Sequence, residues 1–212
     1  IAGMIKQTRG LALTTCFTRT REKRDAFAEK FGCDKETSYE DVLARDDVEA
    51  VIITAPNNKH ADLTIAAAER GKHVFVDKPI ATTIADARAM IDACRKGGVK
   101  LAIGASSRFL RGHRLCKKLV DDGTLGTLAM VECNYSNDRG LYYTPDNWQW
   151  YKDGSPGGPL MQVAIHQIDN LYYMFGPVKR VSAEFRKILT QSEIPDVCVM
   201  WLEFESGLLG TL

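Results

Sequence analysis

The sequence predicts an α/β protein in which a doubly wound parallel sheet, lacking its first strand, is followed by an α+β domain with a mostly antiparallel sheet. Two observations lead to this fold class. In the first half, short apolar runs alternate with segments of helical periodicity, which is typical of a parallel sheet covered by helices. After residue 104, longer strands of alternating polarity dominate, as in an antiparallel sheet.

The first half repeats one strand-helix unit. Predicted strands cover residues 11–17, 50–54, 73–76 and 100–103, and predicted helices cover residues 21–31, 58–70 and 83–96. Glycines end the helices, because glycine adopts the left-handed conformation of a helix C-terminus without strain. We place the domain boundary near residue 104.

The second half begins with a predicted helix at 108–121. It continues with a strand at 128–134, a loop rich in Trp, Pro and Gly at 138–159, a helix at 160–175 and strands at 178–189, 196–205 and from 208 onward. Their alternation predicts a sheet with one face covered by helix.

We expect the parent protein to continue beyond both ends of this chain. Residues 1–5 have the pattern of the later part of a helix whose preceding strand and Gly-rich turn are absent, and residues 207–212 stop inside a strand. The first strand of a doubly wound sheet is usually central, so its absence would leave a gap lined by unpaired backbone groups.

The composition favours a soluble, cytoplasmic protein that acts on a small molecule. The chain has 28 basic and 27 acidic residues, and neither sign forms a block that would bind nucleic acid or an anionic membrane. No apolar run approaches the roughly 20 residues of a membrane span, and no signal peptide is recognisable. Six widely spaced cysteines suit buried, reduced thiols, and we expect no metal site.

Asp77-Lys78-Pro79 is the first candidate for chemistry. It directly follows the strand at 73–76, and ligands of open α/β sheets bind outside the carboxyl ends of the strands. Pro79 favours an extended Lys78, so the ammonium is presented from a stiff turn. By itself a Lys-Pro dipeptide is more typical of a solvated loop lysine before a helix.

The residues around Asp77-Lys78-Pro79 favour a functional role for this motif. The turn Thr54-Ala55-Pro56-Asn57-Asn58-Lys59-His60 and the later Gly71-Lys72-His73-Val74-Phe75-Val76-Asp77-Lys78-Pro79 resemble the glucose-fructose oxidoreductase and inositol dehydrogenase (Gfo/Idh/MocA) family, whose members show Thr-Pro-Asn-x-x-His and Glu-Lys-Pro at this separation. The resemblance continues through Gly158-Pro159-Leu160-Met161-Gln162-x-x-x-His166-x-x-Asp169 to Gly176-Pro177. It spans nearly all of the chain.

The resemblance implies an NAD(P)-dependent dehydrogenase or reductase that acts on the CH–OH group of a sugar, polyol or related cyclic alcohol, or on the corresponding carbonyl. Residues 1–104 would form a dinucleotide-binding Rossmann domain, incomplete at its N-terminus. Residues 105–212 would form a substrate-binding and oligomerisation domain, incomplete at its C-terminus, and its sheet would join a homodimer or homotetramer.

The predicted helix at 160–175 has a polar stripe. Gln162, His166, Asp169 and Tyr173 recur at steps of four, three and four and share one face. Apolar residues on the other faces can pack: Val163, Ile168, Leu171 and Phe175. A core histidine bonded to Asp169 would also explain the stripe, but the resemblance makes His166 the proton-transfer residue.

Carbinol oxidation needs a base, a cation near the developing oxyanion and a hydride acceptor. His166 titrates near neutrality, Lys78 can stabilise the alkoxide, and Asp169 could fix the imidazole tautomer or position the substrate. Gln162 stands where polyol-oxidising relatives often have aspartate, and an amide cannot take a proton, so the role of base shifts to His166. The same groups can run carbonyl reduction.

The expected cofactor contacts lie on the turns that follow the strands. They are Thr18, Arg19, Ala55, Pro56, Asn57, His60, Asp77, Lys78 and Arg108. Three positions depart from the family pattern: Asp77 replaces the commoner Glu, Ala55 the commoner Thr, and Ser106 an Asn in Asn-x-Arg-Phe.

The end of the second strand indicates the cofactor. The position that is acidic in NAD enzymes is Thr18, followed by Arg19, which favours the 2′-phosphate of NADP, although NAD is possible. Arg21, Lys23 and Arg24 either add positive potential there or form a solvated first helical turn.

Several interpretations stay open. Asn57 suits a helix N-cap as well as a cofactor contact, and His60 is either a helix-surface residue or part of the floor beneath the nicotinamide. The loop at 145–152, with two tryptophans, suits a sugar ring or an interface. The alternative function is a non-catalytic, NADP-binding regulatory or structural paralogue, which Gln162 favours and the retention of Lys78 and His166 disfavours.

Overall fold

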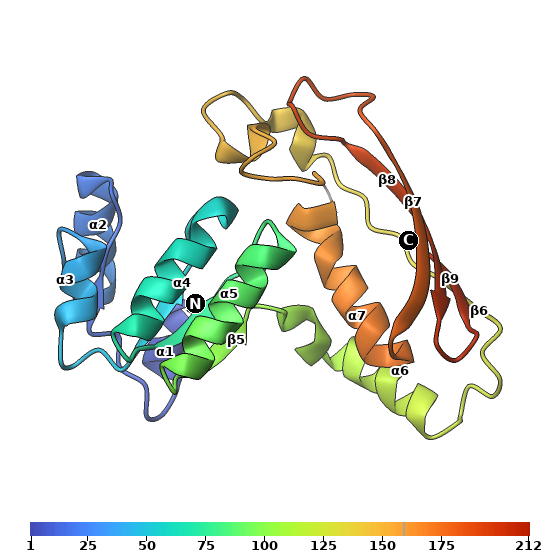
Figure 1. The fold of residues 1–212 in the computed structure, drawn as a ribbon, viewed down its shortest axis with the longest axis horizontal. Coiled ribbons are helices and arrows are strands. Elements are labelled where there is room, and N and C mark those ends of the chain that lie inside the picture. Colours follow the sequence, from blue (N-terminus) through green and yellow to red (C-terminus); the bar gives the residue numbers. More distant parts are fainter. Residues whose placement is uncertain (159) are drawn as a thin grey trace. The chain divides into compact units, whose positions relative to one another are not determined.

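The computed structural model describes residues 1–158 and 160–212 (Figure 1). By compactness the chain divides into two units, each described by itself: Ile1–Ile53, Asp62–Phe75 and Ala89–Ala102 form the first, and Thr54–Ala61, Val76–Arg88 and Ile103–Leu212 form the second. Every helix among the described residues is too short or too polar to span a lipid bilayer. The predicted domain boundary near residue 104 stays a prediction.

The helices and strands of the first half alternate as the sequence predicts. They are α1 (Ala2–Gln7), β1 (Thr15–Cys16), α2 (Arg21–Phe31), β2 (Asp34–Lys35), α3 (Tyr39–Ala44), β3 (Ala50–Ile53), the 3₁₀ turn η1 (Asn57–Lys59), α4 (His60–Glu69), β4 (His73–Val76), α5 (Ile84–Lys96) and β5 (Leu101–Ile103). The first strand is shorter than the predicted 11–17.

The strands of the first half form two sheets. β1 and β2 pair in parallel, with Thr15 opposite Asp34, and β3, β4 and β5 form a second sheet in that order. Helices α4 and α5 connect the strands of the second sheet, as parallel strands require. This is the Rossmann-like arrangement that the sequence predicts.

Glycines set the helix ends where their special geometry is needed. Gly32 has φ 59°, and both its N–H and that of Cys33 donate to the Ala28 carbonyl, which ends α2 at the predicted residue. At Gly97 a Cβ atom would lie 2.6 Å from the Ala68 carbonyl oxygen, so the end of α5 can approach α4 this closely only without a side chain.

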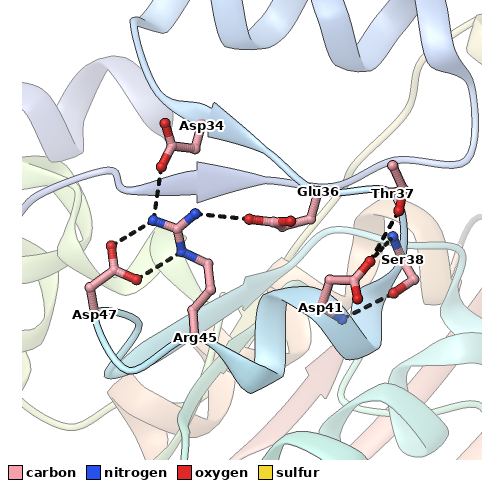
Figure 2. A network of polar contacts seen from close by, with 7 residues as sticks. All are labelled: Asp34, Glu36, Thr37, Ser38, Asp41, Arg45 and Asp47. Atoms are coloured by element: carbon pink, nitrogen blue, oxygen red, sulfur yellow. Dashed lines mark hydrogen bonds and ion pairs between the residues drawn. The ribbon is translucent and has the colours of Figure 1, made fainter.

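The segment between residues 34 and 49 contains two elements that the sequence pattern did not predict, β2 and α3. Ser38 and Asp41 form a capping box, in which the Ser38 hydroxyl accepts the Asp41 N–H at 3.0 Å and the Asp41 carboxylate accepts the Ser38 N–H at 3.2 Å. One guanidinium holds the segment together: Arg45 bonds Asp34, Glu36 and Asp47 at 2.7–2.8 Å (Figure 2).

The second half forms a four-stranded mixed sheet in the second unit. Its elements are η2 (Ser106–Phe109), α6 (Arg111–Asp121), β6 (Met130–Glu132), η3 (Arg139–Tyr142), η4 (Trp148–Trp150), the π-helical turn η5 (Leu160–Ala164), α7 (Ile165–Phe175), β7 (Val178–Arg186), β8 (Val197–Phe204) and β9 (Leu209–Thr211). The strand order is β6-β9-β8-β7, and only the β6–β9 pair is parallel. The predicted mostly antiparallel sheet is therefore confirmed.

Helix α7 covers one face of this sheet (Figure 1). Leu171 of α7 packs with Leu202, Phe204 and Leu208 in a buried cluster, and Phe204 is completely buried. Successive strand residues point to opposite faces, so Val199 and Trp201, which alternate with the buried Met200 and Leu202, are exposed on the other face. Full burial of a phenylalanine side chain contributes about 1.5–3 kcal/mol, which fixes the register of β8.

Two predicted helices of the second half differ from the structure. The helix expected at 108–121 is interrupted at Leu110, whose extended backbone (φ −63°, ψ 139°) separates η2 from α6. The helix expected at 160–175 begins with the π-helical turn η5, so it does not have regular α-helical spacing in its first residues. Part of the loop predicted at 138–159 folds into η3 and η4, and residue 159 lies outside the described residues.

The capping box predicts a stability effect that a matched variant can isolate. Ser38→Ala should lower the free energy of unfolding by about 1 kcal/mol, because it removes the acceptor of the Asp41 N–H. Thr20 is the N-cap of α2 without a side-chain cap bond, so Thr20→Ala should cost much less. Urea unfolding of both variants measures the difference, and equal losses would contradict the role of the capping box.

Candidate active site

The turn after β3 presents the first group of predicted site residues. Pro56 has φ −55° and ψ 145° and is itself the N-cap of η1, so the interpretation of Asn57 as an N-cap is wrong. Asn57 is buried, and its side-chain Nδ2 finds no hydrogen-bond partner among the described residues. A buried amide donor without a partner is costly, which is typical of a position that a ligand completes.

His60 contacts two turns, the one that follows β3 and the one that follows β4. Its ring is completely buried, so the interpretation as a helix-surface residue is wrong. Nδ1 lies 2.8 Å from the Pro79 carbonyl oxygen and Nε2 lies 2.9 Å from the Ala55 carbonyl oxygen. The imidazole therefore connects the turn after β3 with the turn that bears Lys78.

The turn after β4 is fixed by short contacts on both sides. The Asp77 carboxylate accepts the backbone N–H of Lys78 at 2.8 Å. A Cβ atom at Gly104 would lie 2.9 Å from Asp77 Oδ1 and 3.3 Å from Asp77 Cα, so this approach requires glycine. The Lys78 ammonium donates to the backbone carbonyl of Gln162 at 2.5 Å, which joins the turn to η5.

Lys78, His166, Asp169 and Arg108 line one cavity of about 450 Å³. Its remaining walls are mostly apolar: Pro79, Ile80, Ile103, Ala105, Phe109 and Ile165. An apolar cavity with a few converging polar groups is the usual form of a ligand site. Four of the predicted site residues are thus brought together.

The two central groups of this cavity have shifted pKa values. Burial lowers the pKa of Lys78, and the positive charge of Arg139 lowers it further, against the opposing effect of Asp77. Burial and the nearby Lys78 ammonium lower the pKa of His166, whereas Asp77 and Asp169 raise it. Since its pKa lies below the ordinary imidazole value, His166 is neutral at neutral pH and can accept a proton.

Asp169 is paired with Arg108 instead of His166. The Arg108 Nε donates to one carboxylate oxygen at 2.9 Å, and an Nη donates to the other. The guanidinium also lies over the Tyr173 ring, 5.4 Å from its centroid. The expectation that Asp169 fixes the His166 tautomer is therefore wrong; Asp169 holds the orientation of Arg108 at the cavity wall.

The Gln162 side chain leaves the predicted polar stripe. Because η5 is a π-helical turn, Gln162 does not project with His166 and Asp169; its Nε2 donates to the buried hydroxyl of Ser155 at 2.5 Å. It lines a second cavity of about 340 Å³, between the loop after β6 and the β7–β8 connection. The expectation that all four residues share one face is wrong at this position.

Sequence reasoning missed Arg139, Ser155 and Gly104. Arg139 lines the second cavity, and its charge acts on Lys78. Only Gly104 had a sequence signal, a glycine directly after a strand, which often marks a close approach. Trp148 and Trp150 are among the lining residues of neither cavity, so their role stays open.

The predicted ribose-binding residues belong to the first unit. Arg19 is exposed, and Thr18 accepts a hydrogen bond from Arg24 Nη1 at 3.5 Å through its carbonyl oxygen. Arg24 Nε is buried and has no partner among the described residues, so Arg24 is not part of a solvated helical turn, in contrast to the exposed Arg21 and Lys23. A buried guanidinium N–H without a partner is costly, and an anionic ligand could satisfy it.

The electrostatics of the cavity predict opposite pKa changes in two variants. Lys78→Met removes a positive charge and should raise the pKa of His166, whereas Asp169→Asn removes a negative charge and should lower it. Titration of the His166 ring protons by NMR measures both. Lys179→Met, a change on β7, serves as control, and an identical His166 pKa in all variants would contradict the arrangement.

Comparison with known proteins identifies the family of both halves of the chain. Residues 1–105 match the oxidoreductase family with an NAD-binding Rossmann fold, and residues 113–212 match the GFO/IDH/MocA C-terminal domain. A 1,5-anhydro-D-fructose reductase of Ensifer adhaerens is 27% identical over 215 residues, which cover 99% of this chain and 63% of the relative.

Two crystal structures are similar over the whole chain. A protein from Desulfitobacterium hafniense, described as a candidate NADPH-dependent oxidoreductase, has a TM-score of 0.94 and 39% identity over 100% of this chain and 62% of its own. The WlbA dehydrogenase of Bordetella pertussis, in complex with NADH and UDP-GlcNAcA, has a TM-score of 0.91 and 28% identity over 100% of this chain and 61% of its own. This chain spans less than two thirds of the length of these proteins. It belongs to the Gfo/Idh/MocA family of oxidoreductases.

Proposed function

We propose that the protein is an NADP-dependent oxidoreductase that interconverts the alcohol and carbonyl forms of a sugar, polyol or related cyclic compound. The observation that supports this most strongly is the placement of Lys78 and His166 in one largely apolar cavity, where burial, and after it the Lys78 ammonium, lower the pKa of the imidazole. Family members named as reductases and dehydrogenases of sugar substrates support the same substrate class.

The side chains of the cavity supply the proton chemistry. In the oxidative direction neutral His166 accepts the carbinol proton, and the Lys78 ammonium stabilises the alkoxide. Bound NADP would supply the hydride acceptor. Ala55, Pro56 and Asn57 on one turn and Asp77 and Lys78 on the next are proposed to contact it, together with Arg108.

Gln162 and Asp169 are proposed to position other side chains of the site. Gln162 is proposed to orient Lys78 through its carbonyl, because its own side chain points to the second cavity. Asp169 is proposed to hold Arg108 for contact with substrate or cofactor. The reverse reaction uses the same groups, with His166 as proton donor.

The uncovered face of the second-unit sheet supports a proposed homodimer or homotetramer. It exposes Met130, Val199, Trp201 and Leu209, which lie on the face opposite α7. Exposed apolar side chains gathered on one face often mark an interface. A cytoplasmic location is proposed with it, consistent with six free thiols.

Steady-state turnover of the full-length protein tests the activity. With NADP and a panel of sugars and cyclitols, His166→Ala should lower kcat roughly 10²–10⁴-fold, the usual contribution of a positioned acid-base group, and Lys78→Met should also abolish most turnover. His113→Ala is a matched control, because this histidine bonds the Ser107 carbonyl and does not line the cavity.

Two results would reject the proposed mechanism. Normal turnover in either the Lys78 or the His166 variant would show that other groups move the proton. Tight NADP binding with no turnover on any substrate would favour a non-catalytic, NADP-binding regulatory or structural paralogue instead.

The choice of cofactor has its own test. Fluorescence titration should show tighter binding of NADPH than of NADH, and Arg19→Ala should reduce this preference roughly tenfold or more, as loss of a charge-assisted hydrogen bond does. Arg24→Ala should reduce it as well, whereas Arg21→Ala should not, since Arg21 is exposed and faces Asp25. Tighter NADH binding, or an unchanged preference in Arg19→Ala, would contradict the choice of NADP.

A further inference from the structure

Both ring nitrogens of His60 contact hydrogen-bond acceptors, whereas a neutral histidine has only one N–H to donate. The ring is completely buried, and each of its nitrogens lies within 2.9 Å of a backbone carbonyl oxygen, of Ala55 on one side and Pro79 on the other. Carbonyl oxygens only accept hydrogen bonds. A neutral imidazole has one N–H, so one of the two contacts would place two lone pairs against each other.

We propose that His60 is a positioning residue that donates from both ring nitrogens, as an imidazolium, and so clamps the turn after β3 to the turn that carries Lys78. Each hydrogen bond ends on a backbone atom, one at Ala55 and one at the residue directly after Lys78. The clamp therefore fixes the main chain from which the Lys78 side chain reaches the Gln162 carbonyl. Its importance for turnover rests on the proposed function, whereas the hydrogen bonds themselves do not.

The groups around His60 decide whether a positive charge on its ring is stabilised. His60 begins α4, and the start of a helix disfavours a positive charge. The ionisable side chains on the adjoining turns are Lys59, Asp77 and Lys78, and the one carboxylate among them accepts the Lys78 N–H. Charge-assisted hydrogen bonds to two carbonyls are what stabilise the buried cation.

A second histidine provides an internal contrast. His73 Nδ1 accepts the backbone N–H of Lys100 at 3.0 Å, and a backbone N–H can only donate, so this ring nitrogen carries no proton. The two histidines should therefore differ in charge within one molecule: His60 is doubly protonated, and His73 has an unprotonated Nδ1.

Nitrogen-15 NMR of the full-length protein labelled at histidine tests the assignment at neutral pH. His60, assigned by its loss in His60→Gln, should show two protonated ring nitrogens, and His73 should show one bare nitrogen. A bare nitrogen on His60 would overturn the proposal. This readout needs neither substrate nor cofactor, so an inactive protein with a doubly protonated His60 would refute the proposed function alone.

The positioning role has a separate readout at Lys78. In protein labelled at the lysine Cε, the Lys78 signal, assigned with Lys78→Met, should titrate below the exposed lysines. His60→Gln should shift that midpoint toward the exposed lysines, and His73→Gln should leave it unchanged. If His60→Gln keeps its circular dichroism spectrum and the Lys78 midpoint does not move, the positioning role is excluded; if the variant does not fold, the wild-type nitrogen spectrum decides.

Discussion

The contact between the Lys78 ammonium and the Gln162 carbonyl is the constraint on which the cavity depends. It joins residues 84 positions apart, one on the turn after β4 and one in the π-helical turn η5 that precedes α7. Helix α7 itself packs on the sheet through Leu171 and Phe175, so this contact and the Arg108–Asp169 pair link the helix region to the segments that follow β4 and β5. A charge-assisted hydrogen bond in a half-buried place is strong enough to set this geometry.

The two cations that line the cavity, Arg108 and Lys78, have different partners. Arg108 is neutralised by Asp169 and stacked on Tyr173, so it adds little free charge to the cavity. Lys78 faces a neutral carbonyl, and its positive charge adds to the effect of burial in lowering the pKa of His166. The partner of Arg108 is therefore a carboxylate, and the partner of Lys78 is a backbone carbonyl.

Elements with a complete local signal were predictable, and those that depend on distant contacts were not. Helix α2 has helical periodicity and a glycine stop, and its predicted bounds are correct. β2 has two residues, too few for a period, and α3 was overlooked although Ser38 and Asp41 give a capping signal. In the site, the grouping of Lys78 with His166 came from the family resemblance, whereas the Arg108–Asp169 pair and the turn of Gln162 toward Ser155 arise from tertiary packing that no spacing rule contains.

The geometry of the π-helical turn η5 depends on the number of residues between Leu160 and Ala164. Such a turn holds one more residue than an α-helical turn, so deletion of a single residue from Leu160–Ala164 would yield a regular helix. In a regular helix the N–H groups bond the carbonyl four residues back instead of five, so the residues of this turn would take other angular positions relative to His166. The carbonyl that receives Lys78 would then face elsewhere. A one-residue gap here would thus separate the two halves of the site although every side chain named in it was still present.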